Sequence, residues 1–166
     1  LTEIDAWRTR IDAGLIDGPR IIARVGPMLN GKSFNKYQLV AGTPEETRGA
    51  VRTLKQVGVD LVKIHRRLPR DSYFALMDEA KKQELAVAGH IPMEVKPEEA
   101  SDTGQAILTH TETLFEGTFS AGVKDGELPA AIRRFRADGA DALFARFVKN
   151  GTVEVPTLVA YRSIVE

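Results

Sequence analysis

Short apolar runs alternate with amphipathic stretches along most of this chain, and the alternation constrains the fold more than any other feature. The runs that predict strands are "RIIARVG", "VDLVKIH", "LAVAGH", "AILTHT" and "TVEVPTLVAY". Amphipathic helices are predicted between them, because apolar side chains recur there at helical spacing. Strands that alternate with helices form a parallel sheet with right-handed crossovers. The sequence therefore predicts an α/β fold.

The helices have recognisable ends. Residues 43–58 begin with a capping threonine, a proline and two glutamates, and they end in a glycine. Further helices are predicted over Glu3–Ala13, 70–84 and 96–104, and one interrupted helix or two over 129–151. The stretch 28–42, rich in glycine and asparagine, predicts a loop with an extended piece at Tyr37–Val40.

Length and composition set further bounds. A chain of 166 residues, 43% of them hydrophobic, can bury one core, so we expect a single domain or a piece of a larger one. The formal net charge is zero, which argues against a dedicated nucleic-acid surface. The densest basic stretch, with Arg133, Arg134 and Arg136, predicts the solvated face of a helix. No apolar stretch approaches the roughly 20 residues of a membrane span. We therefore expect neither nucleic-acid nor membrane partners.

Cysteine content and the two ends of the chain indicate which kinds of site are possible and how much of a domain is present. The absence of cysteine excludes disulfides and thiolate metal sites, and it leaves the cellular compartment open. An amphipathic helix is predicted from the first residues, and the last residues stop within an apolar pattern. We expect residues 1–166 to form a single segment of a domain that is truncated at both ends.

The chain has three histidines, and each lies at the end of a predicted strand. They are His65 in "VDLVKIH", His90 in "LAVAGH" and His110 in "AILTHT". Because the carboxyl ends of parallel strands meet at one edge of a sheet, these side chains can converge there. Imidazoles from adjacent strands suit a divalent metal of the zinc type. A histidine at a strand end can also be a structural residue with ordinary hydrogen bonds, so both interpretations stay open.

Lys63 lies on the same predicted strand as His65. A protonated amine would repel a metal cation, whereas an uncharged amine can react with carbon dioxide to give a carbamate. A carbamylated lysine is an anionic oxygen ligand that can bridge two metal ions. The alternative is a lysine whose ammonium group extends into solvent. Lys63, His90 and His110 are therefore the candidate metal ligands, and His65, which lies beyond its strand, is the weaker candidate.

Several blocks of the sequence resemble the amidohydrolase superfamily, and most of all its imidazolonepropionase-like and prolidase-like branch. The blocks are "GVDLVKIH", "LMDEAKKQELAVAGHIP", "ASDTGQAILTHTETLF" and "VPTL", preceded by "GLIDGPRIIARVG". The resemblance implies a (β/α)8 TIM barrel of which this chain supplies strands three to seven. It also implies that Lys63 is the bridging carbamylated lysine, and that His90 and His110 bind one or two divalent metal ions, such as zinc.

The sequence departs from the family pattern at three places. The His-x-His pair of the first strand is missing, and the aspartate of the eighth strand would lie beyond Glu166. Thr109 stands where a glutamate usually precedes the last histidine. Three ligands cannot complete a binuclear centre, so the segment alone is expected to be inactive.

Two functions follow as alternatives. The first is a metal-dependent hydrolase of small amide or dipeptide substrates, in which Arg66, Arg67 and Arg70 either bind a substrate carboxylate or are simply solvated. The second is a non-catalytic α/β scaffold that forms a homo-oligomer or binds a partner through open sheet edges. A phosphate-binding module has little support, since "VGPMLNGKS" lacks the spacing of a phosphate loop.

Overall fold

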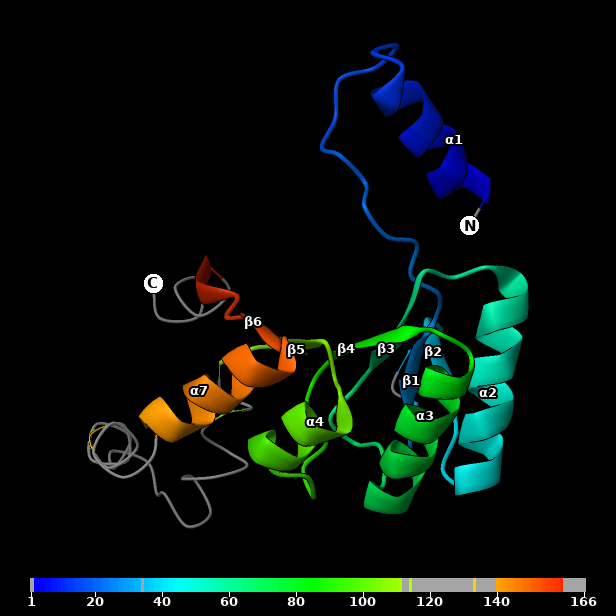
Figure 1. Ribbon diagram of the computed structural model, residues 1–166. Coiled ribbons are helices and arrows are strands. Elements are labelled where there is room, and N and C mark those ends of the chain that lie inside the picture. Colours follow the sequence, from blue (N-terminus) through cyan, green and yellow to red (C-terminus); the bar gives the residue numbers. More distant parts are fainter. Residues whose placement is uncertain (1, 34, 112–113, 115–132, 134–139, 160–166) are drawn as a thin grey trace.

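The computed structural model describes residues 2–33, 35–111, 114, 133 and 140–159. These residues form one sheet with the strand order β2-β1-β3-β4-β5-β6 (Figure 1). Its strands are β1 (Met28–Asn30), β2 (Gln38–Val40), β3 (Leu61–Ile64), β4 (Ala86–Gly89), β5 (Ile107–Thr109) and β6 (Val153–Val155). Every neighbouring pair is parallel. The prediction of an α/β fold with a parallel sheet is confirmed.

The helices of the described residues are α1 (Thr2–Asp12), α2 (Pro44–Val57), α3 (Arg70–Lys82), α4 (Pro97–Thr103) and α7 (Ala140–Asn150). α2 and α3 pack side by side, and so do α4 and α7 (Figure 1). The ends of α2 are as predicted: the Thr43 side chain accepts a hydrogen bond from the backbone N–H of Glu46, and Gly58 ends the helix at φ 85°. Among the helices described, none combines the length and the apolar character that a membrane span requires.

Alternate residues of the strands face the helices and form the core. Val62 and Ile64 of β3 have no exposed surface, and Val87 and Leu108 continue the same layer on β4 and β5. This layer packs against apolar side chains of α2 and α3. Because side chains of a strand alternate between its two faces, Lys63 lies on the opposite face from Val62 and Ile64. Lys63 is half-buried there, outside the packing between the sheet and its helices.

The strand predicted over residues 20–26 is wrong. Only Val25 of that run pairs, in an isolated bridge to the start of β3, and β1 begins after Pro27. Arg24 is held by Asp60 instead, whose carboxylate accepts hydrogen bonds from the Arg24 backbone (2.7 Å) and guanidinium group (3.1 Å). Because proline lacks the N–H that a ladder needs, Pro27 separates this anchor from the paired strand.

The other strands differ from the prediction mainly in length. Within the described part of the last predicted strand, residues 152–159, only β6 pairs, because Pro156 ends the ladder and residues 158–159 are helical. Residues 160 and 161 of that prediction lie outside the described residues. The extended piece predicted at Tyr37–Val40 is confirmed as β2, which pairs with β1. Of the predicted basic helix face, Arg133 is exposed. Arg134 and Arg136 lie outside the described residues.

α1 stands apart from the sheet (Figure 1), and charged side chains connect it to the residues around the start of β3. Arg8 of α1 donates a hydrogen bond to the Asp60 carboxylate at 3.1 Å, and Asp5 lies 3.4 Å from the Arg24 guanidinium. None of the residues of α1 is buried. Asp60 immediately precedes β3, so α1 is anchored at the amino end of this strand. The histidines lie at the opposite, carboxyl end.

Candidate functional site

Four side chains of the candidate site come from three neighbouring strands. Lys63 lies in β3, and His65 follows the last residue of that strand. His90 directly follows β4, and His110 directly follows β5. The ring centroid of His90 lies 4.5 Å from that of His65 and 4.5 Å from that of His110. The three imidazoles therefore form a row along the carboxyl edge of the sheet.

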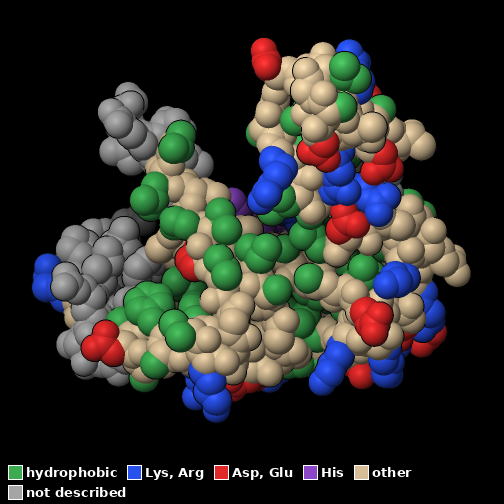
Figure 2. Space-filling view, turned by 45° about the horizontal axis from the view of Figure 1, so that its top comes forward, with side chains coloured by type: hydrophobic (Ala, Val, Ile, Leu, Met, Phe, Trp, Pro, Cys, Tyr) green, Lys and Arg blue, Asp and Glu red, His purple; other side chains and the backbone are tan. Residues whose placement is uncertain are grey.

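Partial burial favours the uncharged form of His65 and His90. Burial, followed by the charge of the neighbouring His65, lowers the pKa of His90 to about 3. Burial also lowers the pKa of His65, and the charges of Arg66 and Arg67 add to the effect. In the space-filling view only a small area of histidine surface is visible (Figure 2). A neutral imidazole is the form that binds a metal ion.

A close approach of two backbones sets the spacing between His65 and His90. Gly89 has a φ of 126°, and a Cβ atom on it would lie 2.2 Å from the carbonyl oxygen of Ile64. The backbone N–H of His90 donates to this same oxygen at 3.2 Å. Only glycine fits this position, because it lacks a Cβ and tolerates the positive φ. The chain can therefore bring the ends of β3 and β4 into direct contact.

His110 is held by the loop that follows β6. Its backbone N–H donates to the carbonyl oxygen of Val155 at 3.0 Å, and its ring nitrogen Nδ1 lies 2.8 Å from the Thr157 hydroxyl. The backbone of His110 has a φ of 74°, a conformation that costs free energy for a residue with a side chain. The strained backbone and the hydrogen bond together fix the orientation of the ring.

Gln105 holds the backbone of β4 and β5 next to the site, and this role was not predicted from the sequence. Its side chain has no exposed surface and donates hydrogen bonds to the carbonyl oxygens of Gly89 (3.1 Å) and Ile107 (3.3 Å). Its own side-chain oxygen accepts a hydrogen bond from the Tyr73 hydroxyl at 3.0 Å. The sequence does hold one sign of this role. Gln105 directly precedes the apolar run of a predicted buried strand, a position where an apolar residue would be expected.

The donor set fits a metal ion only when Lys63 is included. Nδ1 of His90 is buried and has no hydrogen-bond partner among the described residues, which suits a ligand nitrogen. His90 and His110 supply two imidazoles side by side. The described part of the chain holds no group of three or more His, Cys, Asp or Glu side chains that could bind a metal. Among the described residues, the third protein ligand would therefore be Lys63, whose charge acts on both His65 and His90.

Lys63, His65, His90 and His110 therefore lie at the same edge of the sheet. His65, the weaker candidate, lies as close to His90 as His110 does. Among the arginines, Arg70 is engaged within the protein, since its guanidinium group donates to Glu99 at 3.0 Å. Arg66 and Arg67 follow His65 and line a neighbouring cavity.

Comparison with solved structures supports the fold. A scan against protein-family models finds no match, and no curated protein matches the sequence. A protein from Bifidobacterium longum described as a prolidase is 28% identical with a TM-score of 0.50, and the match covers 79% of this chain and 33% of that one. A Xaa-Pro dipeptidase with methionine bound in its active site is 22% identical with a TM-score of 0.56, over 94% of this chain and 39% of that one. Bottromycin amidohydrolase is 19% identical with a TM-score of 0.55, over 77% and 29%.

These similarities confirm the resemblance on which the sequence analysis relied. The parallel sheet and its helices have the architecture of a segment of amidohydrolase and prolidase structures. The chain spans between 29% and 39% of the length of these three proteins. The class of fold is therefore that of the amidohydrolase-type α/β enzymes.

Proposed function

We propose that the intact protein is a metal-dependent hydrolase of the amidohydrolase type, and that residues 1–166 form the central segment of its barrel domain. Its reaction would be the hydrolysis of an amide C–N bond in a small non-peptide or dipeptide substrate. The observation that carries the proposal is the approach of His90 and His110, 4.5 Å between ring centroids, at the carboxyl ends of adjacent strands. Catalytic side chains of α/β barrels occupy this edge. The 28% identity to a protein described as a prolidase supports the choice of an amide bond.

In this proposal Lys63, His90 and His110 hold one or two divalent ions, and zinc is an ion well suited to imidazole ligands. A metal bound there would lower the pKa of a water molecule and polarise the scissile carbonyl group. Burial keeps His90 uncharged and ready to bind. Thr157 engages Nδ1 of His110, so Nε2 is the nitrogen that would face a metal.

Lys63 would serve as a carbamate. The ammonium group first loses a proton, and the uncharged amine nitrogen then adds to the carbon of carbon dioxide and loses a second proton, so that a cation becomes an anionic oxygen ligand. This form would remove the repulsion that an ammonium group would exert on a bound metal cation. It would also supply the third ligand that no His, Cys, Asp or Glu of the described residues provides.

The segment alone is proposed to be inactive, because the His-x-His pair and the aspartate that the family resemblance requires are not among its residues. The test therefore uses the intact protein, with metal analysis and a panel of dipeptides. We expect about one or two zinc ions per chain, and Lys63→Ala or His90→Ala should reduce bound metal and hydrolysis together. Lys55→Ala removes an exposed amine in the last turn of α2 and should change neither. A fully active protein without metal would rule out the proposal.

A non-catalytic scaffold is the second candidate, because β2 and β6 are the outer strands of the described sheet. Val40 of β2 is 51% exposed, and Val155 of β6 is 42% exposed. Exposed strand edges can pair with another chain. Such a scaffold would form a homo-oligomer or bind a partner, and its histidines would be structural. Sedimentation of the 166-residue chain separates the two candidates, since a compact monomer would argue against assembly through the edges.

A further inference from the structure

Gln105 lies between the core and the row of histidines, and each of its four polar groups has a partner. Its backbone N–H donates to the carbonyl oxygen of Ala100 at 3.0 Å. Its backbone carbonyl oxygen accepts from the Thr152 hydroxyl at 3.3 Å, and its side-chain oxygen accepts from the Tyr73 hydroxyl at 3.0 Å. Its side-chain NH2 group donates to carbonyl oxygens of β4 and β5. Because a buried polar group without a partner costs free energy, these contacts hold the side chain in one orientation.

The NH2 group of Gln105 contacts the backbone on both sides of the His90 Cα atom. It donates to the carbonyl oxygen of Gly89 at 3.1 Å and, at a longer distance of 3.4 Å, to that of His90. These two oxygens belong to the peptide groups that precede and follow the Cα atom of His90. Each peptide group is planar, so contacts on both of them restrict φ and ψ of His90 and thereby the direction of its Cα–Cβ bond.

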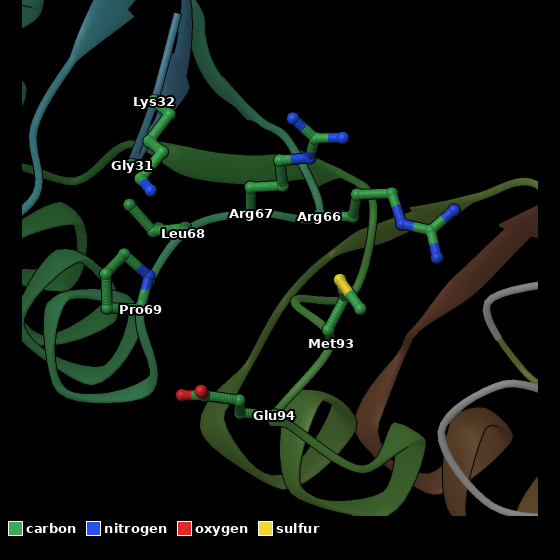
Figure 3. Close-up of a pocket in the computed structure, with 8 residues that line it drawn as sticks. All are labelled: Gly31, Lys32, Arg66, Arg67, Leu68, Pro69, Met93 and Glu94. Atoms are coloured by element: carbon green, nitrogen blue, oxygen red, sulfur yellow. The ribbon is translucent and has the colours of Figure 1, made fainter. Parts of the chain in front are cut away.

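The loop that follows His90 is fastened further along the chain. The backbone N–H of Met93 donates to the carbonyl oxygen of Arg66 at 3.0 Å, and Figure 3 shows both residues on their neighbouring loops. This contact lies beyond Ile91 and Pro92, whereas Gln105 acts on the peptide groups of His90 itself. Gln105 is therefore the side chain best placed to control the direction of the His90 ring.

The direction of this ring matters because His90 is the central member of the row. Its ring centroid lies 4.5 Å from those of His65 and His110. A zinc–nitrogen bond is about 2.0–2.1 Å long, so a ligand ring that swings away from its position lengthens the bond and weakens binding. Groups that orient metal ligands accordingly contribute about 10–100-fold to metal affinity.

We propose that Gln105 is a positioning residue for the candidate metal centre, and that it sets the direction of the His90 imidazole through the carbonyl oxygens of Gly89 and His90. Its effect on metal binding rests on the proposed function, but the orientation of the ring is a property of the chain itself. The competing interpretation is a glutamine that only stabilises the core. Tyr73 separates the two, because its hydroxyl bonds to the side-chain oxygen of Gln105 and leaves the NH2 group in place.

The first measurement uses the intact protein, stripped of metal with a chelator and labelled with carbon-13 at its histidines. Nuclear Overhauser effects between the ring protons of His90 and His110 report how the two rings approach, and His90→Gln and His110→Gln assign the signals. We expect Gln105→Met, which fills the same space without an NH2 group, to weaken this effect and shift the His90 ring signals. Tyr73→Phe is the matched control. It removes one hydrogen bond from the same glutamine and should preserve the effect and the signals.

The second measurement is metal affinity, by competition of zinc with a coloured chelator. Gln105→Met should bind zinc about 10–100-fold more weakly, and Tyr73→Phe should bind it as the unchanged protein does. The visible absorption of bound Co²⁺, which depends on coordination geometry, should change in Gln105→Met alone. Circular dichroism shows which variants are folded. If Gln105→Met does not fold, Gln105→Glu takes its place, because it keeps the acceptor for Tyr73 but can donate at most one hydrogen bond.

An unchanged effect between the rings of His90 and His110 in the folded variant of Gln105 would overturn the positioning role. An equal loss of this effect in Tyr73→Phe would overturn it as well. The first measurement needs no metal, so a protein that binds none can still show the altered ring and would then reject the hydrolase alone. Zinc bound equally tightly with and without the Gln105 amide would reject the positioning role alone.

Discussion

The Tyr73 hydroxyl donates a hydrogen bond of 3.0 Å to the side-chain oxygen of Gln105, and neither residue has exposed surface. The Gln105 amide donates in turn to the carbonyl oxygen of Gly89 at 3.1 Å. These contacts join α3 to β4 and β5, the strands whose ends carry His90 and His110. A buried polar network at this place couples the packing of the core to the geometry of the candidate site.

Replacing Gln105 with leucine should lower the free energy of unfolding by about 2–3 kcal/mol, because the Tyr73 hydroxyl and the Gly89 carbonyl would be buried without these partners. Tyr73→Phe removes a single hydroxyl and should cost about 1 kcal/mol. Urea unfolding followed by circular dichroism measures both losses. A larger loss for Tyr73→Phe than for Gln105→Leu would contradict the proposed importance of the glutamine.

Gly89→Ala should destabilise the protein by more than about 3 kcal/mol, because the new Cβ would collide with the backbone and the positive φ would be strained. Gly104→Ala is the matched control. It has a φ of 95°, but no atom lies within 4 Å of its added Cβ, so only backbone strain of about 1–2 kcal/mol remains. Thermal unfolding compares the two variants. Equal losses would mean that the close approach of β3 and β4 contributes little.

Thr157→Val should weaken zinc binding by about 10–100-fold, because it removes the hydroxyl that orients the His110 ring. The measurement is competition with a coloured chelator on the intact protein. Thr111→Val is the control, since the Thr111 hydroxyl donates to the carbonyl oxygen of Pro156 at 3.4 Å and not to a histidine. Unchanged zinc affinity in Thr157→Val would argue that His110 is not a ligand.

Acid should weaken the contact between α3 and α4. The hydrogen-bonded guanidinium group of Arg70, followed by the backbone N–H of Lys96, lowers the pKa of Glu99 from 4.5 to about 2. Since the pKa is lowered in the folded state, the stabilisation is complete above pH 4.5 and is lost as the pH falls toward 2. Glu99→Gln should therefore lower the free energy of unfolding at neutral pH and have little effect near pH 2. Urea unfolding at both pH values checks this, and an equal effect at both would contradict it.

The edge that carries the candidate site can be predicted from sequence, because apolar runs identify parallel strands and histidines follow them. The position of the His65 ring cannot, since it lies beyond β3 and depends on a turn in which Leu68 donates to the His65 carbonyl oxygen. Strand β1 is also missed. Its three residues carry too little periodicity, and the contact between Arg24 and Asp60 decides where pairing begins.

The contact at Gly89 has a consequence for any redesign of this protein. Main-chain atoms, and not the imidazole rings, determine how far apart positions 63 and 90 stand. Other metal-binding side chains introduced at these two positions would extend from backbone atoms that keep the same separation. An engineer could therefore exchange the chemistry of this rim, for instance carboxylates for nitrogen donors, while keeping its dimensions.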